Sequence, residues 1–187
     1  IFYLDRDPKT CAQMHCDKHV VKMIIEYAQL MSTAHRVLDG EQYTDLTAAG
    51  RRIQRWRMFD DRENELMKAS HVNHPSGVWC RDNDSNYQWL YTMWKHLCEE
   101  YTHRYGKVHA CARLDWLLSL TPDNIKTGEF YPPTPAMPQE LKLLAEIPVP
   151  GRKYDSLKSY HNYYIQAKAS FAKWKNRNIP EWFVINV

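Results

Sequence analysis

The sequence predicts an all-α fold, a compact single-domain helical bundle that spans residues 1–187. Several stretches repeat apolar residues with the helical period, and capping or helix-breaking residues flank them. The chain has 187 residues and is 44% hydrophobic, which is enough for one domain with its own core. A short extended segment at the amino end and a proline-rich arm over residues 130–150 complete the predicted architecture.

The amino-terminal part is predicted to hold an extended segment and two helices. Residues 1–5 are expected to be extended, and Asp7 followed by Pro8 is typical of a helix start, so a short helix should run to about His15. The strongest helix begins at Asp17 and ends at Asp39 and Gly40. Its core-facing stripe comprises Val20, Val21, Ile24, Tyr27, Ala28 and Met31.

Residues 41–70 are interpreted as a basic insertion. We expect a loop over residues 41–50 and a charged, partly helical segment from Gly50 to Lys68. Pro75 and Gly77 interrupt the stretch that follows, so residues 71–77 are predicted to be a turn or loop.

Three further helices are predicted towards the carboxyl end. A long one should run from about Ser85 to Tyr105 and stop at Gly106, and a short one should cover about residues 112–120. Residues 130–150 carry most of the prolines and are expected to be extended and irregular. The last helix is predicted from about Asp155 to Lys175.

The number of cysteines and the hydropathy of the chain indicate in which cell compartment we expect the protein. The odd count of five cysteines at irregular spacing does not suggest a disulfide framework, so we expect free thiols in a reducing compartment. No apolar run approaches the length of a membrane span. We therefore expect a cytoplasmic protein, in the host cytoplasm if it is encoded by a phage, with no membrane association and no obligate protein partner.

Glu26 is the first candidate for chemistry. It follows Lys22 by four residues and His19 by seven, so the three side chains share one face of the predicted helix. A carboxylate held among bases and cations can act as a general base. The alternative interpretation is that Lys22 and Glu26 form an ordinary surface ion pair.

A metal site is the second candidate. His15 and His19 are four residues apart, Cys11 and Cys16 lie beside them, and residues 71 and 74 offer two more imidazoles. Against a metal, the chain has no paired Cys-x-x-Cys motif, and Asp17 is expected to cap a helix between the two histidines. We favour buried thiols and structural histidines, and we expect no cofactor.

A basic, aromatic-rich cluster is the third candidate. The formal charge is only +3, but the positive residues cluster in sequence around aromatic residues such as Trp56 and Trp174, which we expect to be exposed. Phosphate contacts need such charge and base stacking needs such rings, although a solvated charged face would have the same composition. The predicted DNA-contacting residues are Arg36, Arg51, Arg52, Arg55, Arg57, His74, Arg81, Lys173 and Lys175.

The order of these motifs resembles the pyrimidine-dimer DNA glycosylases of the endonuclease V type. In that family too an Asp stands two residues before a His, and a catalytic Glu follows the His by seven, as in Asp17, His19 and Glu26 here. The stretch His74-Pro75-Ser76-Gly77-Val78-Trp79 and the long helix after it resemble the second signature of the family. The aromatic tail Pro180-Glu181-Trp182-Phe183 resembles its carboxyl-terminal region.

The resemblance implies a specific chemistry on duplex DNA. Such enzymes are all-helical, flip a base out of the helix, and attack C1′ of the damaged nucleotide with an amine to form a Schiff base. Glu26 would take the role of the catalytic carboxylate, with His19 beside it. The family uses its amino-terminal amine as nucleophile. Because the chain starts at Ile1 without Met, an upstream start is also conceivable, and Lys18 or Lys22 would then be the substitute amine.

The function expected from the sequence is therefore a DNA glycosylase, with or without abasic-site lyase activity, that acts on damaged or modified pyrimidines. Two alternatives stay open. One is a non-catalytic nucleic-acid-binding protein on the same scaffold, and the other is a metal enzyme with His15 and His19 as ligands.

Overall fold

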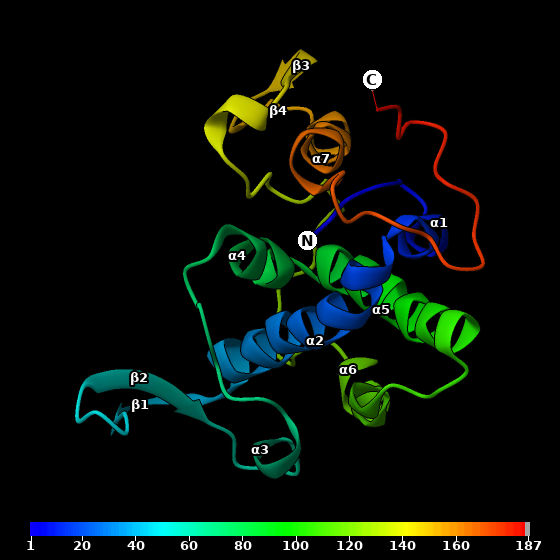
Figure 1. The fold of residues 1–187 in the computed structure, drawn as a ribbon. Helices are drawn as coiled ribbons and strands as arrows, with labels where there is room; N and C mark the ends of the chain where they lie inside the picture. Colours follow the sequence, from blue (N-terminus) through cyan, green and yellow to red (C-terminus); the bar gives the residue numbers. More distant parts are fainter. Residues whose placement is uncertain (186–187) are drawn as a thin grey trace.

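The computed structural model describes residues 1–185, and it corrects the predicted fold class. The described residues form seven α-helices and two antiparallel sheets of two strands each, with 48% helix and 11% strand. The all-α prediction is therefore wrong, and the fold is mixed α/β (Figure 1). Both sheets are hairpins. The first lies where a loop and a partly helical segment were predicted, and the second begins in the predicted irregular arm.

Four helices form the body of the molecule. α2 (Asp17–Asp39) and α5 (Asp84–Tyr105) pack against each other, α1 (Pro8–Met14) packs on α5, and α4 (Pro75–Asp82) packs on both α2 and α5. The predicted short first helix and both long helices are thus confirmed to within a residue or so. The predicted stop at Gly106 is confirmed as well, because this glycine adopts φ +66°.

α4 was missed because its proline was interpreted as a helix breaker. Pro75 occupies the first turn, where no backbone N–H is needed, and the His74 side chain caps the helix by accepting from the Ser76 N–H at 3.1 Å. The predicted turn over residues 71–77 is therefore correct only for its first part. α4 is important for the candidate site because Ser76 and Arg81 lie on it and His74 caps it.

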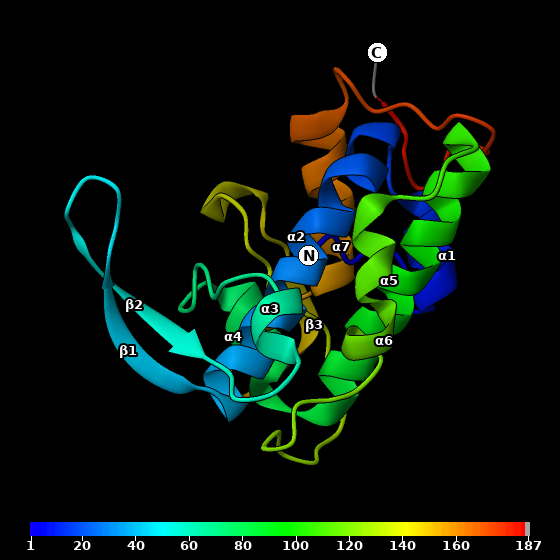
Figure 2. The ribbon, with the colours of Figure 1, turned by 90° about the horizontal axis from the view of Figure 1, so that it is seen from below.

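The basic insertion is largely a β-hairpin. β1 (Glu41–Leu46) pairs with β2 (Arg52–Arg57), the turn uses Gly50 at φ +76°, and the short α3 (Arg62–Glu65) follows. Figures 1 and 2 show this hairpin standing out from the helical body beyond the end of α2. Charged, polar and a few apolar residues are mixed along both strands, so the pattern lacks the regular apolar alternation by which strands are usually recognised.

The carboxyl-terminal part holds the other irregular elements. η1 (Ala110–Leu114), α6 (Asp115–Leu118) and η2 (Gln139–Leu141) are short. β3 (Leu144–Val149), inside the predicted proline-rich arm, pairs with β4 (Arg152–Tyr154), which follows the arm. α7 (Ser156–Tyr163) continues only into the π-helical turn η3 (Tyr164–Lys168), short of the predicted end at Lys175. The chain then crosses to the start of α2, where the Lys173 carbonyl accepts from the Asp17 N–H at 2.8 Å.

Among the described residues, none of the helices combines the length and the apolar character that crossing a bilayer requires.

Candidate active site

The first two residues, Ile1 and Phe2, lie beside α4 and α2. The Ile1 nitrogen is buried and donates to Ser76 Oγ at 3.3 Å. With the α-amine on Ile1, burial lowers its pKa to about 6, although the nearby Glu26 carboxylate acts in the opposite direction. At neutral pH such an amine is mostly unprotonated, which is the form that attacks an electrophilic carbon.

A chain of hydrogen bonds holds this segment in place. The Phe2 N–H donates to Tyr27 Oη at 2.9 Å, and the Tyr27 hydroxyl lies 2.8 Å from His15 Nε2. His15 Nδ1 lies 2.8 Å from the Cys11 carbonyl, which can only accept, so Nδ1 carries the proton and Nε2 accepts from Tyr27. Burial lowers the pKa of His15 to about 3, which keeps the ring neutral and this order of donors fixed.

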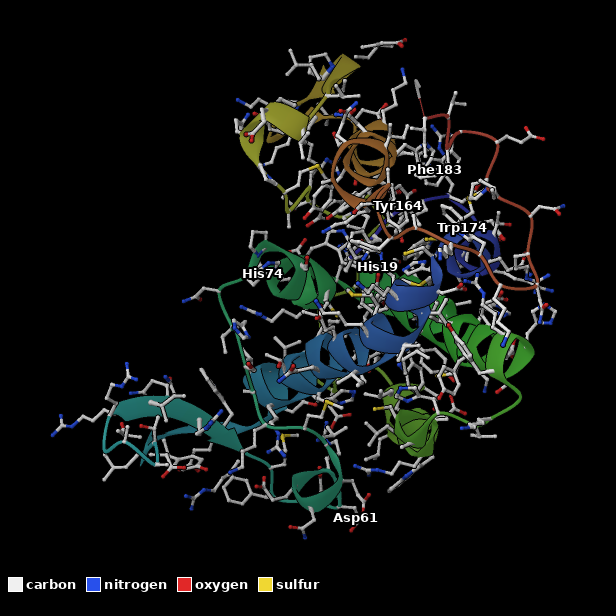
Figure 3. The ribbon with its side chains drawn as sticks, viewed as in Figure 1. His19, Asp61, His74, Tyr164, Trp174 and Phe183 are labelled. Atoms are coloured by element: carbon white, nitrogen blue, oxygen red, sulfur yellow. The ribbon has the colours of Figure 1, made fainter. Side chains whose placement is uncertain are left out.

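His19 packs against the amino-terminal segment and against Tyr164. The Phe2 ring stacks on its imidazole with centroids 4.0 Å apart, and the Tyr164 hydroxyl pairs with His19 Nδ1 at 2.6 Å. Figure 3 shows His19 and Tyr164 close together, with His74 on the neighbouring α4. Burial lowers the pKa of His19 to about 3, so the ring is neutral near pH 7 and positions Phe2 without adding a charge.

Glu26 is half-exposed on α2. Its carboxylate forms an ion pair with Lys22 at 3.3 Å, and the Lys22 side chain is 69% exposed. Lys18 is exposed too, with its ammonium 4.5 Å from the centre of the Phe171 ring. Burial away from water is the usual way in which a lysine becomes nucleophilic. Lys18 and Lys22 are both exposed, whereas the Ile1 nitrogen is buried.

α4 adds two basic side chains. Partial burial lowers the pKa of His74, and the nearby amine and His71 lower it further. Burial also lowers the pKa of Arg81, and its Nη1 has no hydrogen-bond partner among the described residues. Nη1 is itself buried, whereas the Arg81 side chain as a whole is half-exposed.

This geometry can be compared with known proteins. The sequence model of one family, described as pyrimidine dimer DNA glycosylase, matches residues 1–113, which is more than half of the chain. The chain belongs to the pyrimidine dimer DNA glycosylase family. The match covers the amino segment, α2, α4 and α5, and it confirms the resemblance inferred from the sequence. No curated protein and no solved structure matches the chain.

DNA is the substrate that membership of the pyrimidine dimer DNA glycosylase family implies. The predicted DNA-contacting residues fall into groups with different surroundings. His74 and Arg81 lie on α4, while Lys173 and Lys175 are exposed in the segment after η3, where the Lys175 ammonium lies 5.4 Å from the centre of the Tyr105 ring. The structure therefore does not gather all of them into one cluster.

The hairpin carries four of the predicted arginines. Arg51, Arg52 and Arg57 are exposed, and the Arg57 guanidinium lies 4.3 Å from the centre of the Tyr43 ring. Arg55 is half-buried and donates to the Ala69 carbonyl at 2.9 Å, which ties β2 to the segment before α4.

Arg36 has a different environment from the rest of the predicted set. It is 2% exposed, and its three nitrogens donate to the Glu63 carboxylate and to four carbonyl oxygens, those of Trp56, Glu63, Leu66 and Met67. A guanidinium whose donors are all used inside the protein supports the fold, so we leave Arg36 out of the proposed DNA contacts.

The side chains around His15 and His19 do not fit a metal site. Both ring nitrogens of His15 are engaged, and His19 Nδ1 pairs with Tyr164. Residues 1–185 contain no group of three or more His, Cys, Asp and Glu side chains arranged to hold an ion.

Sequence reasoning missed Ser76, Tyr27 and Tyr164 as parts of the site. Ser76 was assigned to a loop, Tyr27 was counted in the apolar stripe of its helix, and Tyr164 lay inside the predicted last helix, on its apolar face. Their hydroxyl partners lie far away in sequence, so helical periodicity carried no signal for them. The match of Ser76 to the second signature of the family was the one available pointer.

Proposed function

We propose that this chain is a DNA glycosylase with an associated lyase step, acting on damaged or modified pyrimidines in duplex DNA. The observation that carries the proposal is the buried position of the Ile1 nitrogen, which donates to Ser76 Oγ at 3.3 Å. With the α-amine on Ile1, burial lowers its pKa to about 6 and the Glu26 carboxylate interacts with its charge. Family membership supports the glycosylase activity, and the geometry around Ile1 supports the covalent step.

The chemistry follows from these two groups. The neutral amine attacks C1′, and the glycosidic bond breaks with its electron pair leaving on the base, which takes up one of the two protons released from the nitrogen. The other proton passes to O4′ as the C1′–O4′ bond breaks and the sugar ring opens to an imine. Glu26 stabilises the positive charge that develops at C1′. The imine makes the C2′ proton acidic, and removal of that proton by the Glu26 carboxylate expels the 3′ phosphate, which cuts the strand.

Basic residues around the site would hold the duplex. We propose phosphate contacts by His74 and Arg81 on α4, by Arg51, Arg52 and Arg57 on the hairpin, and by Lys173 and Lys175 after η3. Each is exposed or half-exposed, and Arg81 lacks a carboxylate partner among the described residues. Phosphate contacts of this kind contribute affinity that weakens with salt.

The test is covalent trapping. The protein is incubated with ultraviolet-irradiated, abasic and undamaged duplexes in the presence of borohydride, and the adduct is mapped by peptide mass. We expect an adduct on the damaged and abasic duplexes, located on the first peptide of the chain. Glu26→Gln should lower strand cleavage by 10²–10⁴-fold, roughly the contribution of a general base.

Lys18→Ala and Lys22→Ala serve as matched controls and should still form the adduct. An adduct on a lysine peptide would overturn the assignment of the amine. Salt-sensitive binding without base release on any damaged or modified duplex would overturn the catalytic proposal in favour of a non-catalytic DNA-binding protein.

A further inference from the structure

The two faces of the β1–β2 hairpin differ in composition. In an antiparallel ladder, residues that pair across the strands point to the same side, and successive pairs alternate sides. The register pairs Gln42 with Trp56, Thr44 with Gln54, and Leu46 with Arg52, so these six side chains share one side. We call this side the amide face.

The amide face is open to solvent and ordered. Five of its six side chains are exposed, and Trp56 is half-buried. Gln42 Nε2 donates to Gln54 Oε1 at 3.3 Å, and Gln54 Nε2 donates to Thr44 Oγ1 at 3.2 Å. The amides therefore form a connected row across the two strands.

The opposite face is turned towards the protein. Its central side chains, Tyr43, Asp45, Ile53 and Arg55, are all half-buried. The bond from Arg55 Nη1 to the Ala69 carbonyl, at 2.9 Å, fixes this orientation. The amide face is thus the side that remains available to a partner.

The size and charge of the hairpin fit duplex DNA. Two strands lie about 4.8 Å apart, and the major groove of B-DNA, about 12 Å wide, admits a two-stranded ribbon. Four arginines stand on or beside the ribbon against two acidic residues, Glu41 and Asp45, so its net charge is positive. Figures 1 and 2 show the ribbon projecting clear of the helices, as insertion into a groove requires.

The residue types on this face are those that distinguish base pairs. A glutamine amide can pair with the N6 and N7 edge of adenine, arginine with guanine, and the methyl groups of Thr44 and Leu46 can pack against the thymine methyl. We propose that the amide face enters the major groove beside the lesion and gives the enzyme a preference for the flanking base pairs. This inference rests on the proposed function for its partner, duplex DNA.

The test uses a pool of duplexes that carry one central tetrahydrofuran abasic analogue and randomised flanking base pairs. The bound fraction is sequenced for the full chain and for Gln42→Ala/Gln54→Ala. The wild type should enrich particular base pairs on one side of the analogue, and the double variant should lose on the order of tenfold of that enrichment. Its salt dependence should not change, because neither amide is charged.

Asp45→Asn, on the opposite face, is the matched control and should keep the wild-type preference. Equal enrichment by the wild type and the double variant, or no flanking preference in the wild type, would overturn the inference. The trapping experiment separates this result from the proposed function. A flanking preference without a borohydride adduct refutes the covalent chemistry alone, whereas an adduct without a flanking preference refutes the amide face alone.

Discussion

Tyr27 is the residue through which the amino-terminal segment is held. Its hydroxyl accepts from the Phe2 N–H at 2.9 Å in a partly buried bond and donates to His15 Nε2 at 2.8 Å in a buried one. Phe2 is the neighbour of the proposed nucleophile, so a small displacement here moves the amine relative to Glu26. Reacting groups tolerate little displacement, and a shift of about 1 Å can cost on the order of a hundredfold in rate.

We therefore predict two effects for Tyr27→Phe. Stability should fall by about 1–3 kcal/mol, because a buried N–H and a buried imidazole nitrogen lose their partner. The rate of borohydride trapping should fall by tenfold or more at temperatures where the variant is folded. Denaturant unfolding and trapping kinetics measure the two effects, and Tyr43→Phe on the hairpin should change neither. An unchanged trapping rate would show that Tyr27 does not position the amine.

At the scale of elements, two arginines illustrate different uses of the same side chain. Arg36 lies near the end of α2 and joins that helix to β2 and α3 through buried hydrogen bonds, whereas Arg51 is exposed at the hairpin turn. Both were predicted as DNA contacts, since composition and local spacing do not distinguish them.

Substituting each arginine by glutamine should separate the structural use of Arg36 from the proposed DNA-binding use of Arg51. Arg36→Gln is expected to cost about 3–5 kcal/mol of stability, because it leaves Glu63 and several carbonyls without a donor. Arg51→Gln should leave the unfolding curve unchanged but reduce the slope of log K against log salt for duplex binding by about 0.9. A stable Arg36→Gln with a reduced salt slope would return Arg36 to the DNA-contacting set.

At the scale of the whole molecule, buried histidines link stability to pH. Burial lowers the pKa of His15 and His19 to about 3 and that of His35 to about 4, from 6.5 for an ordinary histidine. Below pH 6.5 the unfolded chain therefore binds protons that the folded chain does not. The stability from these groups is fully present above that pH and is lost as the pH falls towards 3.

We predict that the midpoint of thermal unfolding falls steadily between pH 6.5 and 4. His35→Gln should make this decline shallower, since one titrating group is removed while an amide can still pair with Tyr87 and Arg62. Melting curves across this pH range provide the measurement. The same slope in the variant and the wild type would show that His35 does not contribute.

The first helix and the two long helices could be predicted from the sequence because their signals are local. Apolar spacing and caps lie within a few turns of each other, so Asp17–Asp39 was predicted with its observed bounds, and His19, Lys22 and Glu26 were placed along one face of it. The order of motifs also sufficed to indicate the family, which the match over residues 1–113 confirms.

Tertiary structure alone decided the rest, because the interactions involved join residues far apart in the chain. The hairpins depend on cross-strand pairs that charged and proline-rich sequences do not reveal. The burial of the Ile1 amine depends on Ser76, and the neutral state of His19 depends on the packing of Phe2 and Tyr164 around it. Desolvation is a property of the assembled environment, so no local pattern could have indicated which side chains are buried away from water.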